Sequence, residues 1–195
     1  MHGLINRAIQ CFVSDSYGVD NWVEVARVAN LRFVEFESML VYDDDLTPNL
    51  LDSVSYVLNR PRDDVMEDIG TYLVSHPNVE RLRRLLRFGG VTFVEFLHSL
   101  DDLPDRARLA VSDLTLPRIE LREHGPGHFS LICESPLVGY GHVVMGVLRA
   151  MADDYGALAV LEHAGSGKGV ETISITLIET EFAEGRSFEL GARAS

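Results

Sequence analysis

Residues 93–106 read Phe93-Val94-Glu95-Phe96-Leu97-His98-Ser99-Leu100-Asp101-Asp102-Leu103-Pro104-Asp105-Arg106. The large apolar residues of this stretch recur every three or four positions, which is typical of the buried stripe of an amphipathic helix. Pro104 interrupts that stripe. Proline has no amide hydrogen and clashes with the preceding turn, which costs about 3 kcal/mol in a helix interior. The stretch therefore predicts a helix that is kinked or divided at Pro104.

The end of this stretch, Ser99-Leu100-Asp101-Asp102-Leu103-Pro104, resembles a run in the H-NOX family, the heme nitric oxide/oxygen-binding domains of bacteria and of soluble guanylate cyclase. The family writes this run as Asn/Ser-Leu-Asp-x-Leu-His, and its histidine is the protein ligand to the heme iron. Here Pro104 stands in the histidine position, and a proline side chain has no donor atom for iron. The resemblance thus implies a heme-sensor fold whose iron ligand is missing.

Other parts of the chain extend the resemblance over roughly residues 1–180. The similar stretches, in chain order, are Met1–Asn6, Tyr17-Gly18, Trp22, Phe36–Met39, Tyr42–Asp44, Leu86–Gly90, Gly139 and Val143–Val147. Each stretch is short, but their order and spacing together are specific to the family.

A second family motif is altered as well. H-NOX domains carry Tyr-x-Ser-x-Arg, whose side chains hold the heme propionates. The matching stretch here has Cys133 in the tyrosine position, Ser135 in the serine position and Leu137 in the arginine position. An arginine pairs with carboxylate oxygens through charge-assisted hydrogen bonds, which a leucine cannot form. Glu134 and the acidic balance of the chain would also oppose two further carboxylates.

The resemblance also implies which side chains line the heme pocket. They are Ile5, Leu73, Leu100, Pro117, Val143 and Val147. Val143 matches a distal position where some relatives place a tyrosine that hydrogen-bonds bound oxygen, so a conventional heme sensor with this sequence would favour nitric oxide. His98 is a candidate substitute ligand, but it lies about 240° around the helix from Pro104.

The hydrophobic period predicts the fold class, because helical spacing gives way to alternation after Pro117. Helices are expected over residues 4–17, 20–30, 45–59, 61–76 and 139–155, before Gly89-Gly90 and from Val91, and strands over 119–122, 129–131, 157–163 and 170–179. Helices followed by a sheet with a covering helix indicate an α+β fold with an antiparallel sheet. We expect one H-NOX-like domain over residues 1–195, with a helical N-terminal subdomain (1–60) and a mixed α/β C-terminal subdomain (61–195).

Composition narrows the classes of partner. The chain has 195 residues, of which 46% are hydrophobic, and a net charge of −13. Such a charge disfavours nucleic acid and anionic membranes as partners. No apolar run is long enough to span a bilayer, and the chain opens without a basic-then-apolar signal segment. We expect a cytoplasmic protein.

Several smaller features have ordinary structural interpretations. The arginines at 81, 83, 84 and 87 alternate with leucines, which predicts a helix with a solvated basic side or, alternatively, a docking face for an acidic partner. Gly165–Gly169 lacks the spacing of a phosphate loop and predicts a hairpin turn. His124 and His128 flank a Gly-Pro-Gly turn without further ligands, so no metal site is expected. A redox role for Cys133 stays open, because reactivity requires exposure and a lowered pKa.

These observations favour a sensory or signalling protein of the H-NOX type that has lost heme binding of the family's kind and acts through protein–protein contacts. By resemblance, its partner would be a histidine kinase or a cyclic-dinucleotide enzyme, and no catalytic residues are expected. One alternative is that the pocket persists and binds heme through another ligand, or a different apolar small molecule. The other is a conventional nitric oxide-sensing heme protein.

Overall fold

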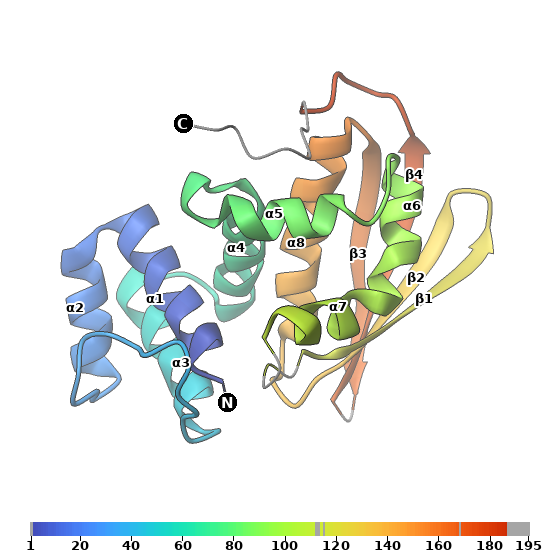
Figure 1. The fold of residues 1–195 in the computed structure, drawn as a ribbon. Coiled ribbons are helices and arrows are strands. Elements are labelled where there is room, and N and C mark those ends of the chain that lie inside the picture. The colour runs from blue at the N-terminus through green and yellow to red at the C-terminus, as the bar shows by residue number, and fades with distance from the viewer. Residues whose placement is uncertain (1, 112–113, 115, 168, 187–195) are drawn as a thin grey trace.

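The computed structural model describes residues 2–111, 114, 116–167 and 169–186. It confirms the expected α+β class (Figure 1). The helices are α1 (Gly3–Tyr17), α2 (Val19–Val28), α3 (Leu46–Leu58), α4 (Arg62–Ser75), α5 (Glu80–Arg87), α6 (Phe93–His98), α7 (Leu103–Ala110) and α8 (Tyr140–Tyr155), with short 3-10 turns η1 (Pro77–Val79) and η2 (Ser99–Asp102). Most helix ends fall within a few residues of the positions that the sequence predicted.

Pro104 divides the stretch that opened the sequence analysis. α6 ends at His98, η2 follows, and Pro104 lies in the first turn of α7. Proline is tolerated at this position because the first amide hydrogens of a helix have no partner inside the helix. The predicted division is therefore confirmed. α6 begins two residues later than Val91, because Thr92 and Glu95 form a capping box there.

The strands of the described residues form an antiparallel sheet in the order β1-β2-β4-β3. Their bounds are β1 (Arg118–Gly125), β2 (His128–Glu134), β3 (Leu158–Gly167) and β4 (Val170–Glu179). The interpretation of Gly165–Gly169 as a turn is partly wrong. Gly165 pairs with Thr172 and Gly167 pairs with Val170, so strand β3 runs on through Gly167 after a bulge. Lys168 lies outside the described residues.

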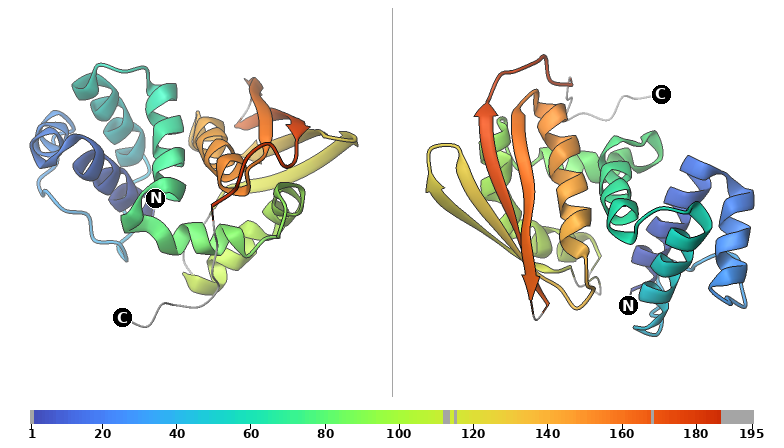
Figure 2. Two further views of the ribbon diagram at one scale, coloured as in Figure 1. Left: turned by 90° about the horizontal axis from the view of Figure 1, so that it is seen from above. Right: turned by 180° about the vertical axis from the view of Figure 1, so that it is seen from behind.

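Helix α8 is the central layer of the protein. Seen from above, it lies between the sheet and α4, and α1–α3 lie on the far side of α4 (Figure 2). One hydrophobic core fills the space between α8 and the sheet and includes Leu148, Met151 and Ile173. A second core joins α4 to α1–α3 around Phe12, Leu50 and Met66. Helix α8 thus links the two cores.

Glycines allow α4 and α8 to cross at very short range. A Cβ placed on Gly70 would overlap the carbonyl oxygen of Val143, and one placed on Gly146 would overlap that of Glu67. Both glycines have ordinary negative φ values, so the requirement is for space and not for a special backbone conformation. The position of α8 against α4 therefore depends on the absence of these two side chains.

The arginine-rich helix α5 differs from the sequence prediction. Arg83 donates to Asp154 of α8 at 2.6 and 2.9 Å, and Asp154 is only 2% exposed. Arg87 lies over the ring of Tyr155 with its guanidinium carbon 3.9 Å from the ring centroid. The solvated basic side was thus the wrong interpretation for these two arginines. Their side chains point inward because Asp154 is buried and needs a cationic partner.

We expect Gly146→Ala to lower stability by about 1–3 kcal/mol, because the methyl group forces the two helices apart. A chain of this size should then melt about 2–4 °C lower for each kcal/mol lost. Thermal unfolding followed by circular dichroism measures the effect. Gly125→Ala is the matched control, since a Cβ there meets nothing within 4 Å. An unchanged melting temperature in Gly146→Ala would show that the crossing has room to spare.

Candidate cofactor pocket

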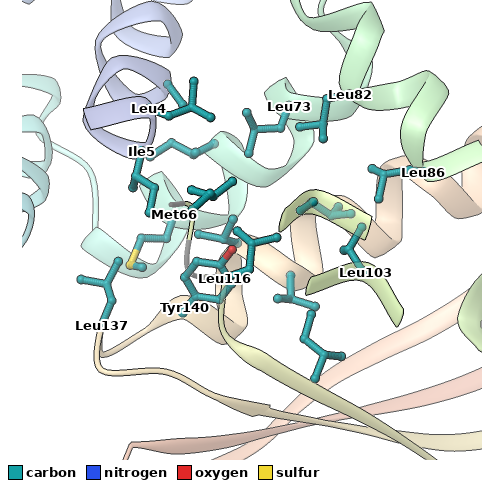
Figure 3. A pocket seen from close by; sticks show the side chains of 18 of the residues that line it. Leu4, Ile5, Met66, Leu73, Leu82, Leu86, Leu103, Leu116, Leu137 and Tyr140 are labelled. Atoms are coloured by element: carbon teal, nitrogen blue, oxygen red, sulfur yellow. The ribbon is translucent and has the colours of Figure 1, made fainter. Parts of the chain in front are cut away.

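An apolar cavity of about 310 Å³ lies where α1, α4, α5, α7 and α8 meet. We call it the inner cavity. Its wall is made almost entirely of aliphatic side chains, contributed by helices from both ends of the chain (Figure 3). Ligand pockets in proteins have volumes of about 300–1,000 Å³, so a space of this size is large enough for a small molecule. The core has therefore not closed completely over this region.

The structure brings most of the predicted pocket residues together. The inner cavity is lined by Ile5, Leu73, Leu100, Leu137, Val143 and Val147, among others. These side chains come from segments far apart in the sequence and meet around one space. Their role in binding stays a prediction. Pro117 and Ser135 line a second space beside the first, and Cys133 lines neither.

Position 104 lies at the edge of the inner cavity. Pro104 is half-buried, and it does not line the cavity itself. Leu100, four residues before it, and Ala107, three residues after it, both do. A side chain longer than proline at this position would thus start next to the cavity. His98 is not nearby: its Nε2 lies 3.6 Å from Glu123 and its ring contacts Phe129 edge-on, away from the lining residues.

The segment from Cys133 to Leu137 forms a corner at the end of β2 in which Cys133, Ser135 and Leu137 are buried. Cys133 is 1% exposed and faces the core between the sheet and α8. Ser135 is buried, and its hydroxyl accepts a hydrogen bond from the Leu137 amide at 3.1 Å. The serine therefore serves the local backbone turn. Leu137 is buried and adds an apolar side chain to the cavity wall.

A second space, which we call the outer cavity, has a volume of about 1,030 Å³ and shares several lining residues with the inner one. The shared residues are Ile5, Leu116, Leu137 and Tyr140. Asp44, Asp45 and Glu134 bring carboxylates to the outer cavity, and Arg118 brings a guanidinium. Among the described side chains of the outer cavity, carboxylates thus outnumber guanidinium groups, which disfavours an anionic group there.

Tyr140 is the residue that the sequence interpretation missed. Its side chain lines both cavities, and its hydroxyl points in among the aliphatic side chains (Figure 3). No described residue exchanges a hydrogen bond with this hydroxyl. Burial raises the pKa of Tyr140, and the nearby Cys133 adds to the shift, so the phenol stays neutral. The signal was available, because Tyr140 lies three residues before Val143 on the same face of a helix.

Glu171 of β4 holds the first turn of α8. Its carboxylate accepts hydrogen bonds from the amides of Gly139 at 2.8 Å and Gly141 at 3.0 Å. A carboxylate is favourable here because the first amides of a helix lack acceptors and carry partial positive charge. His163 Nε2 lies 3.0 Å from the same carboxylate, and its ring stacks on His142 with centroids 4.6 Å apart. This network fixes the start of α8 relative to the sheet.

Neither a metal cluster nor a membrane helix is evident in the described part of the chain. No group of three or more His, Cys, Asp or Glu side chains there is arranged to hold a metal ion. The ring of His124 instead lies 2.8 Å from the Ser130 hydroxyl. None of the helices formed by the described residues is long and apolar enough to cross a bilayer.

The family model described as Haem-NO-binding matches residues 2–163. The chain belongs to this family. That result agrees with the resemblance of the stretch before Pro104 and of the stretch from Cys133 to Leu137 to family motifs. As its description says, heme is the ligand characteristic of this family.

The curated relatives are much longer than this chain. Soluble guanylate cyclase gcy-31 of Caenorhabditis elegans is 27% identical over 154 residues, which are 79% of this chain and 22% of the cyclase. Soluble guanylate cyclase 89Da of Drosophila melanogaster is 22% identical over 160 residues, or 82% of this chain and 24% of the cyclase. The chain therefore spans about a quarter of the length of these relatives.

Solved H-NOX structures share the fold. An H-NOX protein from S. oneidensis, in the Fe(II) ligation state, superposes with a TM-score of 0.75 at 20% identity and covers 93% of this chain and 98% of its own. The I5F mutant of T. tengcongensis H-NOX gives a TM-score of 0.74 at 16% identity, with 92% and 99% covered. At these identities the likeness establishes the fold alone.

The residues around the inner cavity do not fit a heme held in the family's manner. The only side chains in its described wall that carry a possible iron donor are Met66 and Tyr140. Tyrosine binds heme iron as the phenolate, and burial raises the pKa of Tyr140. The arginine position is Leu137, and the adjoining space is acidic. The donor set thus lacks both a strong iron ligand and a partner for two propionates.

Burial raises the pKa of the Cys133 thiol to about 12, with a smaller contribution from Glu171. Because the thiolate is the reactive form, we expect Cys133 to be inert toward disulfide reagents at neutral pH. In a Cys11→Ser background, the native protein should show no reaction of its thiol with the reagent over about an hour. After denaturation, one equivalent of thiol per chain should react. Rapid reaction of the native protein would restore the redox interpretation.

Proposed function

We propose that this chain is a sensory domain of the Haem-NO-binding family that no longer binds heme in the family's manner and that signals through protein contacts. The observation that carries the proposal is Pro104 in the iron-ligand position, in the first turn of α7 and next to the cavity wall. A proline cannot be a ligand in any side-chain conformation. The iron ligand is therefore absent whatever the orientation of α7, because the proline side chain has no donor atom.

Two further positions support the same conclusion. Leu137 contributes a buried apolar side chain where the family has an arginine, and Cys133 is buried in the core between the sheet and α8. Both substitutions replace a polar anchor by a residue that packs. Both anchors of the cofactor have thus changed, while the framework that surrounds them matches the family over residues 2–163.

The partner belongs to the proposal as well. The relatives named above are soluble guanylate cyclases, and this chain corresponds to about a quarter of their length. By family resemblance we propose a signalling enzyme as the partner, such as a histidine kinase or a cyclic-dinucleotide enzyme. We propose no catalytic role for the chain itself and no role in nucleic-acid or membrane binding.

A second candidate, heme held by a different ligand, is favoured by one observation. Tyrosine is an axial ligand in some heme proteins, and the Tyr140 hydroxyl faces the inner cavity. A conventional nitric oxide sensor is the remaining alternative. Heme titration of the wild type and of Tyr140→Phe separates the three candidates. Under the proposed function neither protein binds heme in the family's manner. A tyrosine-ligated heme would be lost in Tyr140→Phe, whereas a conventional sensor would bind heme in both proteins.

We predict that Pro104→His combined with Leu137→Arg gains heme affinity over the wild type by at least about tenfold. The histidine would supply an axial iron ligand, and the arginine would add a charge-assisted contact to a propionate that contributes about 1.5–3 kcal/mol. Titration with hemin, reduction and exposure to nitric oxide, followed by absorption, give the readout. Cys133 is left unchanged because a tyrosine would overfill the core around it.

The matched control is Pro104→Ala with Leu137→Arg, which removes the proline and restores the arginine without supplying an iron ligand. It should bind hemin more weakly than Pro104→His with Leu137→Arg, because the arginine alone supplies no iron ligand. A wild-type protein that takes up heme stoichiometrically and shifts its Soret band with nitric oxide contradicts the proposed function.

A further inference from the structure

We infer that the inner cavity binds a neutral hydrophobic small molecule whose hydrogen-bond acceptor is held by the Tyr140 hydroxyl. The inference rests on the proposed function, because it requires that heme does not take the space. It goes further in naming the chemistry of the ligand and the residue that selects it.

The first step concerns the polarity of the cavity wall, in which the Tyr140 hydroxyl lies among aliphatic side chains. The wall consists of aliphatic side chains such as Leu73, Leu103 and Val147, together with Met66. Such a wall favours an apolar ligand, since transfer from water contributes roughly 25 cal/mol for each Å² of apolar surface buried. None of the described side chains in the wall carries a charge that could stabilise a buried ion.

The second step concerns the hydroxyl itself. Tyr140 is half-buried, and its hydroxyl is accessible from the inner cavity. A hydroxyl in an apolar space gains free energy from a hydrogen-bond partner. The Tyr140 hydroxyl points into the inner cavity and exchanges no hydrogen bond with any described residue. Burial raises the pKa of this phenol, so it acts as a donor and not as an anion. A carbonyl or ether oxygen on a ligand would supply the acceptor that the protein does not.

The third step is the charge at the entrance. The outer cavity adjoins the inner one at Tyr140 and Leu137, and its carboxylates outnumber its guanidinium group. Asp45 lies at the start of α3 and Glu134 at the end of β2, and both line the outer cavity. An anionic amphiphile would meet repulsion there and a neutral phenol inside. The preferred ligand is therefore uncharged.

The alternative outcome for a space without its cofactor is collapse, in which the wall residues would pack against each other. Ile5, Leu73 and Leu100 all still line the inner cavity, which retains about 310 Å³. The glycine crossing of α4 with α8 and the contact of Glu171 with Gly139 and Gly141 hold α8 in place on two sides. Helix α8 is thus not free to move into the space.

The test measures fluorescence of N-phenylnaphthylamine, a neutral apolar probe, on the full chain. The probe should show saturable enhancement, and methyl nonyl ketone should displace it. Undecane, which has the same chain length, should also displace the probe, and its affinity should not depend on the tyrosine hydroxyl because it cannot accept the hydrogen bond. Undecanoate should compete more weakly than either at neutral pH, since its charge would have to be buried.

Tyr140→Phe should reduce the affinity for the ketone about tenfold and leave the affinities for probe and undecane unchanged. Tyr56→Phe is the matched control, because Tyr56 is 76% exposed and should change none of the three. Val147→Phe places a larger side chain in the cavity and should abolish enhancement of the probe. A melting temperature at or above that of the wild type would show that this variant is folded.

Each result has a defined meaning. Absence of saturable probe binding, equal ketone affinity in Tyr140→Phe, or undecanoate as good a competitor as the ketone overturns the inference. Hemin titration of the same preparation tests the proposed function independently. Failure to bind both hemin and the apolar ligands leaves the proposed function standing and removes only the ligand, whereas stoichiometric heme uptake removes both.

Discussion

The close crossing of α4 and α8 sets the geometry of the whole protein. The two helices meet at Gly70 and Gly146, where any side chain would overlap the backbone of the other helix. Because α8 also packs against the sheet, this single contact fixes the distance between the sheet and the N-terminal helices. The inner cavity is the space that remains at the edge of the crossing. It exists because rigid helices, and not flexible loops, form most of its wall.

The changes at the family's functional positions are of different physical kinds. Pro104 removes a donor atom, Leu137 replaces a cation by an apolar group, and Cys133 is buried where no ligand reaches it. Ser135 keeps its family identity, yet its hydroxyl bonds the backbone of the corner that it belongs to. A serine that stabilises a turn is retained whether or not a cofactor is bound. Identity with a family motif at one position is thus compatible with loss of the function of the motif.

Much of the fold could be predicted from the sequence, because helical and alternating periods are local properties. The division at Pro104 followed from the covalent structure of proline, and the sheet followed from the change of period after Pro117. The inward direction of Arg83 could not be predicted, because its cause is Asp154, a residue 71 positions away. Strand β3 runs on through Gly167 because it pairs with β4, whereas local composition favoured a turn.

The candidate site divides in the same way. Ile5, Leu73, Leu100, Val143 and Val147, which line the inner cavity, were predicted by resemblance, whereas Pro117 lines the outer cavity instead. Tyr140 was not predicted, because the prediction used only the positions of the family motifs and Tyr140 is not one of them. Its importance becomes visible only when the partners of its hydroxyl are searched for in three dimensions. The subdomain boundary at residue 60 and the identity of the partner stay predictions.

A ligand of the inner cavity would affect the lifetime of the protein. A ligand that binds only the folded chain stabilises it by about 2.7 kcal/mol at a hundred times its Kd. That is a substantial part of the stability of many domains. A ligand that fills the space would therefore shift the balance between folded and unfolded chains, and cellular proteases degrade the unfolded ones. The abundance of the protein would then follow the supply of its ligand.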